Sequence, residues 1–214
     1  MQPIELIIFD LDGTLTDSLA DLTAATNRMR RHFRRTDLSP EQVRQLVGQG
    51  SRNLVERALP GAPAEEIEEG LSIFLAHNDA HIADKTRLYP GVAETLEALQ
   101  GRGKQLAVIS NKNVALCRKL LALLGADGYF AAILGADSLP FRKPSPEPVL
   151  KLLADFGVPP RRAMMVGDSI NDIAAGLGAG VVTVGCSYGY GDVAELSGAD
   201  FLIDTFAGLL ELPL

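Results

Sequence analysis

The chain has 214 residues, of which 47% are hydrophobic, and its formal net charge is −7. This length suffices for one large domain or for a domain with a smaller one inserted, and the apolar content excludes a disordered chain. The acidic balance argues against binding to nucleic acids or membrane surfaces, because such binding relies on excess Lys and Arg. Two cysteines cannot form a disulfide framework, and no leader or membrane span is expected, so we expect a cytoplasmic protein, either a monomer or a small homo-oligomer.

The chain begins with a short apolar run, residues 4–9, which predicts a buried strand. Strand patterns are missing from residues 17–85. Helical segments separated by Pro and Gly occupy this stretch instead, and Pro40 and Pro63 stand where helices begin, as Pro prefers. We therefore predict an all-helical inserted domain over residues 17–85, with helices at 19–33, 40–47, 53–59 and 64–83.

From residue 86 onward, predicted strands and helices alternate. The strands are expected at 105–110, 132–134, 163–166, 181–184 and 201–203. The helices are expected at 92–100, 114–124, 147–156 and 170–179, with one more at the C-terminus. Repeated strand–helix units imply a doubly wound, mostly parallel sheet with helices on both faces. The predicted fold class is therefore α/β, with a Rossmann-like core domain formed by residues 1–16 and 86–214 and an inserted helical cap domain.

Two carboxylates, Asp10 and Asp12, follow the first predicted strand, and Gly13 and Thr14 open a turn after them. Ligands of open α/β sheets bind beyond the carboxyl ends of the strands. Residues i and i+2 of a strand face the same side, so the two acids would repel each other unless a cation such as Mg²⁺ lies nearby. A turn with two capping acids is the alternative interpretation.

A second acidic pair, Asp168 and Asp172, follows the predicted strand at 163–166 and lies at the start of a helix. The i, i+4 spacing allows both acids to share one cation, although ordinary N-capping would explain them equally well. Ser110 and Asn111 end another strand, where a hydroxyl and helix N–H groups can hold an anion or simply cap the helix. Lys143, followed by Pro144, could be held toward an anion as a point charge, whereas a solvated loop lysine is the ordinary alternative.

Taken together, these four motifs resemble the haloacid dehalogenase superfamily of aspartate-nucleophile phosphatases. They match in order: Asp10 and Asp12 first, Ser110 second, Lys143 third, and Asp168 with Asp172 fourth. The helical insert lies where the mobile cap of that superfamily lies. Within the superfamily, the chain is most similar to phosphoglycolate phosphatases, at residues 9–18, 47–50, 89–92, 110–112, 143–144 and 188–190.

The resemblance implies a role for each motif. Asp10 would attack phosphorus and form an aspartyl-phosphate, and Asp12 would protonate the leaving alcohol and then accept a proton from water. Mg²⁺ would be held by Asp10, the backbone carbonyl of Asp12 and Asp168, with support from Asp172. The implied phosphate-binding residues are Asp10, Gly13, Ser110, Asn111 and Lys143.

The cap is expected to choose the substrate. Gly48 and Gly50 lie in a loop between cap helices that can approach a ligand closely, and Arg52 is a candidate for binding a substrate carboxylate. A surface arginine is the alternative for Arg52, and the basic cluster over residues 28–35 is most simply a solvated helix face.

The expected activity is hydrolysis of a small phosphorylated metabolite, 2-phosphoglycolate by likeness. Another small phosphate ester, such as a sugar phosphate, and a sugar phosphomutase reaction remain as alternatives. A phospho-receiver or binding domain is the non-enzymatic alternative, and Asp12 and the helical insert argue against it, because a receiver needs neither.

Overall fold

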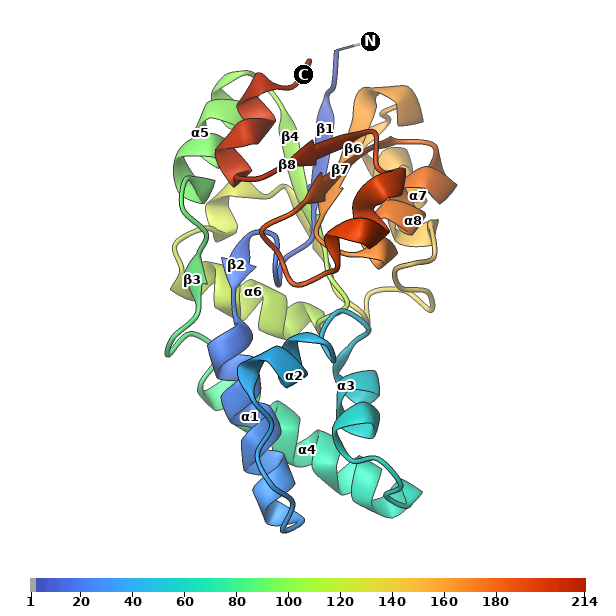
Figure 1. The fold of residues 1–214 in the computed structure, drawn as a ribbon. Helices are drawn as coiled ribbons and strands as arrows, with labels where there is room; N and C mark the ends of the chain where they lie inside the picture. The colour runs from blue at the N-terminus through green and yellow to red at the C-terminus, as the bar shows by residue number, and fades with distance from the viewer. Residues whose placement is uncertain (1–2) are drawn as a thin grey trace.

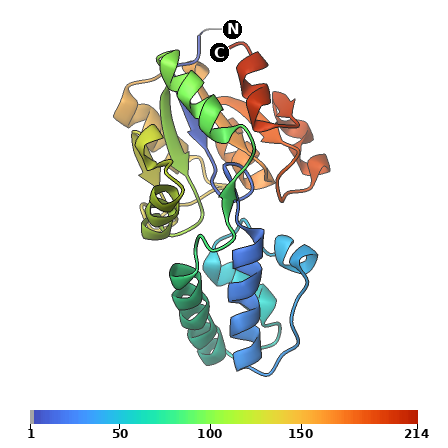
Figure 2. The same cartoon turned by 90° about the vertical axis from the view of Figure 1, so that its left-hand side faces the viewer.

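A computed structural model describes residues 3–214; residues 1 and 2, which belong to the expected core segment 1–16, lie outside the described residues. The chain forms an α/β core and a separate group of helices that adjoin one edge of the core (Figure 1). The C-terminus lies at the end of the core farthest from these helices (Figure 2). The two chain segments that join the parts leave the core on the side of the helices (Figure 1).

The core is built on a parallel sheet. Within the described residues it has six strands in the order β5-β4-β1-β6-β7-β8. Their bounds are β1 (Leu6–Phe9), β4 (Gln105–Ile109), β5 (Ala132–Leu134), β6 (Ala163–Gly167), β7 (Val182–Cys186) and β8 (Phe201–Ile203). The central strand β1 pairs in parallel with both β4 and β6, so the three strands end at one edge of the sheet.

Helices cover both faces of the sheet because alternate residues of β1 point to opposite sides. Ile7 and Phe9 belong to an apolar cluster with α5 (Val92–Gly101), α6 (Val114–Leu123) and the C-terminal 3-10 helix η4 (Phe206–Glu211). Leu6 and Ile8 belong to the opposite cluster with α7 (Glu147–Phe156) and α8 (Ile170–Ala179). Short 3-10 helices occur at η1 (Asp127–Tyr129), η2 (Pro160–Arg162) and η3 (Val193–Gly198). The predicted fold class is confirmed.

The inserted helices have an apolar core of their own. Their bounds are α1 (Leu19–His32), α2 (Pro40–Arg44), α3 (Ser51–Ala58) and α4 (Ala64–Ala80). Met29, Val55 and Phe74 are almost fully buried in this second core, which shares no buried residue with the clusters around the sheet. A group of helices that buries its own apolar surface can act as one body next to the sheet.

The two connections between cap and core lie side by side. Residues of β2 (Thr16–Asp17) pair in an antiparallel ribbon with β3 (Arg87–Leu88). Next to the ribbon, the buried carboxylate of Asp21 accepts hydrogen bonds from the backbone N–H groups of Lys85 and Thr86 and from the Thr86 hydroxyl, at 2.7 to 2.9 Å for Oδ2. These bonds tie the start of α1 to the returning chain.

The structure differs from the sequence-based expectation in a few places. The two-residue strands β2 and β3 were not expected, because two residues show no alternation of apolar and polar positions. Helix α2 ends at Arg44 instead of residue 47, which lengthens the loop that leads to Gly50. The C-terminal segment is a 3-10 helix, η4, instead of an α-helix. Within residues 3–214, no helix combines the length and the apolar character needed to cross a bilayer.

Candidate active site

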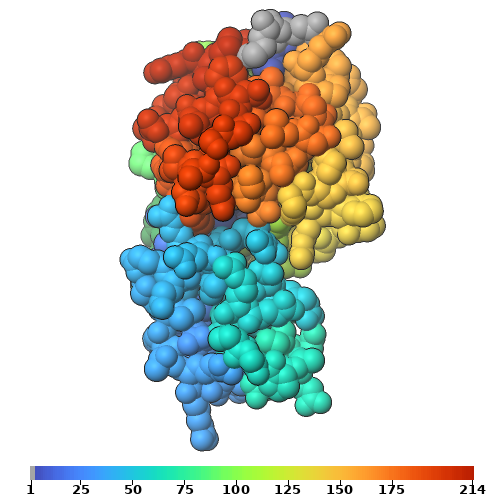
Figure 3. All heavy atoms as spheres, turned by 45° about the vertical axis from the view of Figure 1, so that its right-hand side comes forward, coloured from blue at the N-terminus to red at the C-terminus, as the bar shows by residue number. Residues whose placement is uncertain are grey.

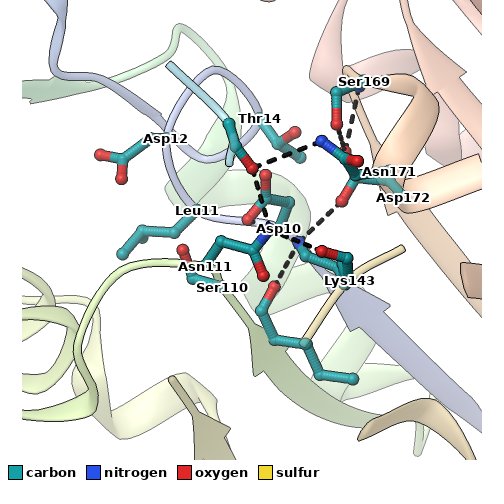
Figure 4. A network of polar contacts seen from close by, with 12 residues as sticks. Asp10, Leu11, Asp12, Thr14, Ser110, Asn111, Lys143, Ser169, Asn171 and Asp172 are labelled. Carbon is teal, nitrogen blue, oxygen red and sulfur yellow. Dashed lines mark hydrogen bonds and ion pairs between the residues drawn. The ribbon is translucent and has the colours of Figure 1, made fainter. Parts of the chain in front are cut away.

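The predicted site residues gather at the carboxyl edge of the sheet (Figure 4), the edge that faces the inserted helices (Figure 1). Asp10 directly follows β1, Ser110 directly follows β4 and Asp168 directly follows β6. Because these three strands are neighbours in the sheet, their ends bring together residues that are up to 158 positions apart, from Asp10 to Asp168. Asp172 in the first turn of α8 and Lys143 in the loop before α7 complete the group.

Lys143 is the positive centre of this group. Its ammonium lies 2.8 Å from Asp10 Oδ1 and 2.7 Å from Asp172 Oδ1, and it also donates a hydrogen bond of 2.6 Å to the Ile109 carbonyl. The side chain is almost completely buried. Burial opposes the charged form, but the two carboxylates outweigh it and raise the pKa of Lys143, so the lysine is a fixed positive charge.

Three carboxylates form a cluster that could hold a cation. One oxygen from each of Asp10, Asp168 and Asp172 lies within 4.8 Å of the others. Asp10 Oδ1 and Asp172 Oδ1 are buried, and Lys143 is their ion-pair partner. Burial, opposed by the charge of Lys143 and reinforced by Asp172 and Asp168, raises the pKa of Asp10 to about 8. Such a set of clustered carboxylate oxygens fits a hard divalent cation such as Mg²⁺.

Both carboxylate oxygens of Asp168 accept hydrogen bonds. Thr14 Oγ1 donates to its Oδ1 at 2.8 Å, and the Tyr190 N–H donates to its Oδ2 at 2.7 Å. Burial and the charge of Asp172 raise the pKa of Asp168 to about 6, against these hydrogen bonds. Gly13 packs directly on this carboxylate: its φ is +90°, and an added Cβ would lie 2.3 Å from Asp168 Oδ2. Only glycine fits at this position.

Asp172 is oriented by the start of its own helix. The backbone N–H and the hydroxyl of Ser169 donate to Asp172 Oδ2 at 3.0 and 2.7 Å, in a capping box. Its second oxygen, Oδ1, is left for Lys143. Gly167 lies beneath this carboxylate, since an added Cβ would come within 2.2 Å of Asp172 Cγ. The capping and cation-binding interpretations of this motif are therefore compatible.

The Asp12 carboxylate lies apart from the cluster (Figure 4). Strand β1 ends at Phe9, so the alternation that we used to place Asp10 and Asp12 on one face does not continue to Asp12, and that argument was wrong. Asp12 instead forms a buried ion pair with Lys112, at 2.7 Å from Oδ1 and 2.6 Å from Oδ2, and accepts a 2.6 Å hydrogen bond from the Ser18 hydroxyl. The two acids thus occupy different electrostatic environments.

The remaining predicted phosphate-binding residues lie next to Asp10 but differ in what they can offer. Ser110 is buried, and its hydroxyl accepts a hydrogen bond from the Lys112 N–H at 3.2 Å. Asn111 donates from Nδ2 to the Gly48 and Lys143 carbonyls, both at 2.9 Å, so it joins the core loops to the cap. The Gly13 N–H already donates to the Thr16 carbonyl, so this glycine contributes close approach and no free donor.

The cap and the core are in contact along one face of the molecule (Figure 3). A cavity of about 710 Å³ lies between them and is lined by Asp10, Asp12 and Gly48 among others. Arg44 of α2 donates from Nε and Nη2 to the Tyr190 and Gly189 carbonyls, at 2.8 and 2.7 Å. Since the Tyr190 N–H supports Asp168, this arginine connects the cap to the acidic cluster.

The loop glycines line the cavities, whereas Arg52 does not. Gly48 lines the large cavity, and both Gly48 and Gly50 line a second, smaller one against the 110–112 segment. Arg52 lines neither cavity: it is exposed on α3 and forms an ion pair with Glu68 of α4 at 2.8 Å. The expectation that Arg52 binds a substrate carboxylate is therefore not supported by its position.

Sequence reasoning missed several residues that shape the site. Lys112 was noted only as part of a motif, and Thr14 only as part of a turn, because their partners Asp12 and Asp168 lie 100 and 154 positions away. The role of Arg44 depends on the position of the cap. The segment around Tyr190, by contrast, carries a usable signal, since its glycines are required for close packing: an added Cβ on Gly189 would lie 2.1 Å from Asp168 Cβ.

Comparisons with known proteins agree with this geometry. A family model described as haloacid dehalogenase-like hydrolase matches residues 4–180. The phosphoglycolate phosphatase of Chromobacterium violaceum is 39% identical over 217 residues, which cover 99% of this chain and 97% of that protein. The crystal structure of a predicted phosphoglycolate phosphatase from Haemophilus somnus 129PT has a TM-score of 0.94 at 36% identity and covers 99% of this chain and 98% of its own. CbbY from Rhodobacter sphaeroides, solved in complex with phosphate, has a TM-score of 0.81 at 30% identity over 96% of both chains.

Proposed function

The chain belongs to the haloacid dehalogenase-like hydrolases and is a phosphoric monoester hydrolase, and on that premise we propose that it hydrolyses 2-phosphoglycolate to glycolate and phosphate with Mg²⁺. The substrate assignment is supported by the curated relatives named phosphoglycolate phosphatase. In this proposal, residues 17–85 are the cap that selects the substrate, and the remainder is the core that carries the chemistry.

In the proposed reaction, an Asp10 carboxylate oxygen attacks phosphorus, and the bond from phosphorus to the alcohol oxygen breaks. Asp12 gives its proton to that leaving oxygen. A water molecule then attacks the phosphorus of the aspartyl-phosphate, loses a proton to Asp12 and releases phosphate together with free Asp10. The ammonium of Lys143 and the hydroxyl of Ser110 stabilise the charge that spreads over the phosphoryl oxygens.

Mg²⁺ would be held by the side chains of Asp10 and Asp168 and the backbone carbonyl of Asp12, with Asp172 in support. When bound, the cation supplies positive charge between the attacking carboxylate and the phosphate dianion. The close approach of one oxygen from each of Asp10, Asp168 and Asp172, all within 4.8 Å of one another, supports this assignment.

One observation carries the proposal: Asp10 and Asp12 are two residues apart yet lie in different surroundings. Both side chains line both cavities, but Asp10 faces Lys143 and the acidic cluster, whereas Asp12 faces Lys112 and Ser18. A nucleophile and a proton donor need such a separation of environments. A phospho-receiver domain needs no second acid that opens on a substrate cavity.

The test is phosphate release in the presence of Mg²⁺ across a panel of small phosphate esters, with Asp10→Asn as the blank. A kcat/KM for 2-phosphoglycolate at least about tenfold above that of every other ester is expected, a transition-state preference of about 1.4 kcal/mol. A preference for sugar phosphates would keep the mechanism and reject the substrate. Phosphoryl return to a sugar phosphate would indicate a mutase, and measurable turnover by Asp10→Asn would reject the nucleophile.

A further inference from the structure

A second cavity lies between the cap and the 110–112 segment. The proposed reaction gives no role to two of its polar side chains, Lys112 and Asn78. Its volume is about 50 Å³, and it opens on both Asp10 and Asp12. Apolar side chains of α1, α3 and α4 (Leu22, Leu54 and Phe74) form its cap side, and the residues that follow β4 form its core side. We call this cavity the Lys112 recess. In the proposed reaction, the phosphorus lies next to Asp10 and the leaving group next to Asp12. The recess that both acids line is therefore open to the leaving group.

Lys112 brings the only cationic side chain to the recess among residues 3–214. The residue is 8% exposed, so its charge is held in a largely dehydrated environment. Two of its three ammonium donors are used by Asp12 Oδ1 and Oδ2, and the third has no partner among the described residues. A free, charged donor thus lies at the wall of the recess.

Asn78 of α4 is the second polar side chain of the recess with donors that the fold does not use. It is 3% exposed and lines the recess, yet none of the hydrogen bonds within residues 3–214 involves its side chain. The Asn78 amide is not among the fully buried unsatisfied groups, so it is reached from the recess that it lines and is available to a ligand there. The Asn78 amide can donate two hydrogen bonds, as a carboxylate requires.

We propose that the Lys112 recess binds the substrate carboxylate, with Lys112 supplying the counter-charge and Asn78 a hydrogen bond. This inference rests on the proposed function and deepens it, because it gives the cap a reason to prefer phosphate esters of short hydroxy acids. A buried carboxylate is stable only when it is paired and hydrogen-bonded. Two acids line the recess, Asp10 and Asp12. Asp10 is paired with Lys143, so Asp12 alone competes with a substrate carboxylate for Lys112.

The volume of the recess sets the size of the substrate. A single water needs roughly 10–15 Å³ of such space. A cavity of about 50 Å³ therefore admits a group of a few heavy atoms, such as the methylene carboxylate of glycolate. The side chains of Leu22, Leu54 and Phe74 close the apolar end, so longer or branched acids would collide with the cap.

Three arginines of the cap near the site are already committed. Arg44 donates to two carbonyls of the 189–190 segment, and Arg57, which lines the large cavity, donates to the Gln45 carbonyl at 2.7 Å. Arg52 pairs with Glu68. The Lys112 ammonium, in contrast, combines burial, a free donor and a position on the recess that Asp10 and Asp12 also line.

The experiment compares kcat/KM for 2-phosphoglycolate with that for 2-hydroxyethyl phosphate, in which a hydroxymethyl group replaces the carboxylate. For Lys112→Met, the ratio of the two constants is expected to fall by about ten- to hundredfold, the worth of a hydrogen bond to a charged group. The ratio cancels any general effect that reaches Asp12. Asn78→Leu, nearly isosteric, is expected to lower the same ratio about tenfold and keeps the test open if Lys112→Met does not fold.

Binding gives a second readout. In the Asp10→Asn background, Lys112→Met should raise the Kd of 2-phosphoglycolate by about tenfold or more while the Kd of inorganic phosphate stays within about threefold. Arg57→Met and Arg52→Met are the matched controls, and the substrate ratio should not change in either. An unchanged ratio in both Lys112→Met and Asn78→Leu, or a collapse in Arg57→Met, would overturn the recess as the carboxylate site. A wild-type enzyme without preference for 2-phosphoglycolate would instead reject the proposed substrate, and this inference with it.

Discussion

The Lys143 ammonium lies 2.8 Å from Asp10 Oδ1, in a position where lysine and carboxylate are both shielded from solvent. The same ammonium is 2.7 Å from Asp172. One lysine therefore contacts two of the three carboxylates of the cluster but neutralises one negative charge, and a bound divalent cation would balance the other two. This arrangement makes Lys143 a structural as well as a chemical part of the site.

Lys143→Met is expected to lower kcat by about 10²- to 10³-fold, the usual effect of removing one donor to a developing oxyanion. It should also lower the melting temperature without Mg²⁺, because Asp10 and Asp172 lose their partner, and Mg²⁺ should restore part of that loss. Steady-state kinetics and melting curves with EDTA or Mg²⁺ test both points. A kcat within tenfold of wild type would contradict the role of Lys143.

The acidic cluster predicts how Mg²⁺ binding depends on pH. Burial, with the neighbouring acids, raises the pKa of Asp10 to about 8 and that of Asp168 to about 6. The folded metal-free protein thus holds these protons more tightly than the unfolded chain, so its stability falls as pH rises from about 4 to about 8. Mg²⁺ displaces the same protons, so its stabilising effect should grow over that range.

Melting temperatures with EDTA and with Mg²⁺, at about pH 5.5 and about pH 8, measure this linkage. At a free Mg²⁺ concentration near 100 times its Kd, binding should stabilise the fold by about 2.7 kcal/mol. The Mg²⁺-induced shift is expected to be larger at the higher pH, and Asp10→Asn should reduce the difference. An equal shift at both values would mean that these carboxylates are already ionised in the metal-free protein.

Most strands and helices could be predicted because buried parallel strands are continuous apolar runs, as in β1 and β6, and because Gly and Pro mark helix ends. The acids at the strand ends could be placed at one site because parallel strands end at one edge. Side-chain pairs between distant segments could not be predicted. The Asp12–Lys112 pair depends on how the turn after β1 faces the loop after β4.

The orientation of the cap helices toward the core could not be predicted from the sequence. Helical periodicity indicates that a face is buried but does not say which of the remaining residues point to the core domain. Arg52 illustrates the difficulty: its neighbours Gly48 and Gly50 lie against the core, whereas Arg52 turns outward to Glu68, which is 16 positions further along the chain. Asn78, in the middle of a long helix, carries no motif at all, and only the assembled cap makes it visible.

Asp12→Asn is expected to separate the two chemical steps. With an alkyl phosphate such as 2-phosphoglycolate, loss of the proton donor should slow turnover by about 10²- to 10⁴-fold. p-Nitrophenolate leaves without a proton, so p-nitrophenyl phosphate should still phosphorylate Asp10, and only the hydrolysis step should be slow. Rapid mixing should then show a burst of about one equivalent of nitrophenolate.

The matched variant is Asp10→Asn, which should give neither burst nor turnover with either ester. If Asp12→Asn turns over 2-phosphoglycolate and p-nitrophenyl phosphate with equal losses and without a burst, Asp12 does not serve as the proton donor. Ser18 and Lys112, which hold the Asp12 carboxylate, can also hydrogen-bond the oxygen of an asparagine amide, so the fold should be retained.

Gly13→Ala tests the close packing on Asp168. A Cβ here would meet Asp168 Oδ2 at 2.3 Å, and φ is +90°. Gly103→Ala is the matched control, because φ is +74° but nothing lies within 4 Å. The control should cost about 1–2 kcal/mol for the left-handed conformation alone. Gly13→Ala should cost more and should also weaken Mg²⁺ binding, as measured by the Mg²⁺-induced shift in melting temperature. Equal losses in the two variants would show that Asp168 moves aside freely.

Arg44→Ala tests the connection between the cap and the acidic cluster. The variant removes two hydrogen bonds to the carbonyls of Gly189 and Tyr190, each worth about 0.5–1.5 kcal/mol. The closed arrangement should therefore become less populated, by roughly tenfold if the two contributions add. KM for 2-phosphoglycolate should rise, and hydrogen exchange at the 189–191 segment should accelerate.

The control is Arg28→Ala. Arg28 is an exposed residue of α1 that makes no side-chain hydrogen bond within residues 3–214, so this variant should change neither quantity. Faster exchange without a change in KM would mean that Arg44 orders the loop but does not govern closure of the cap over the substrate.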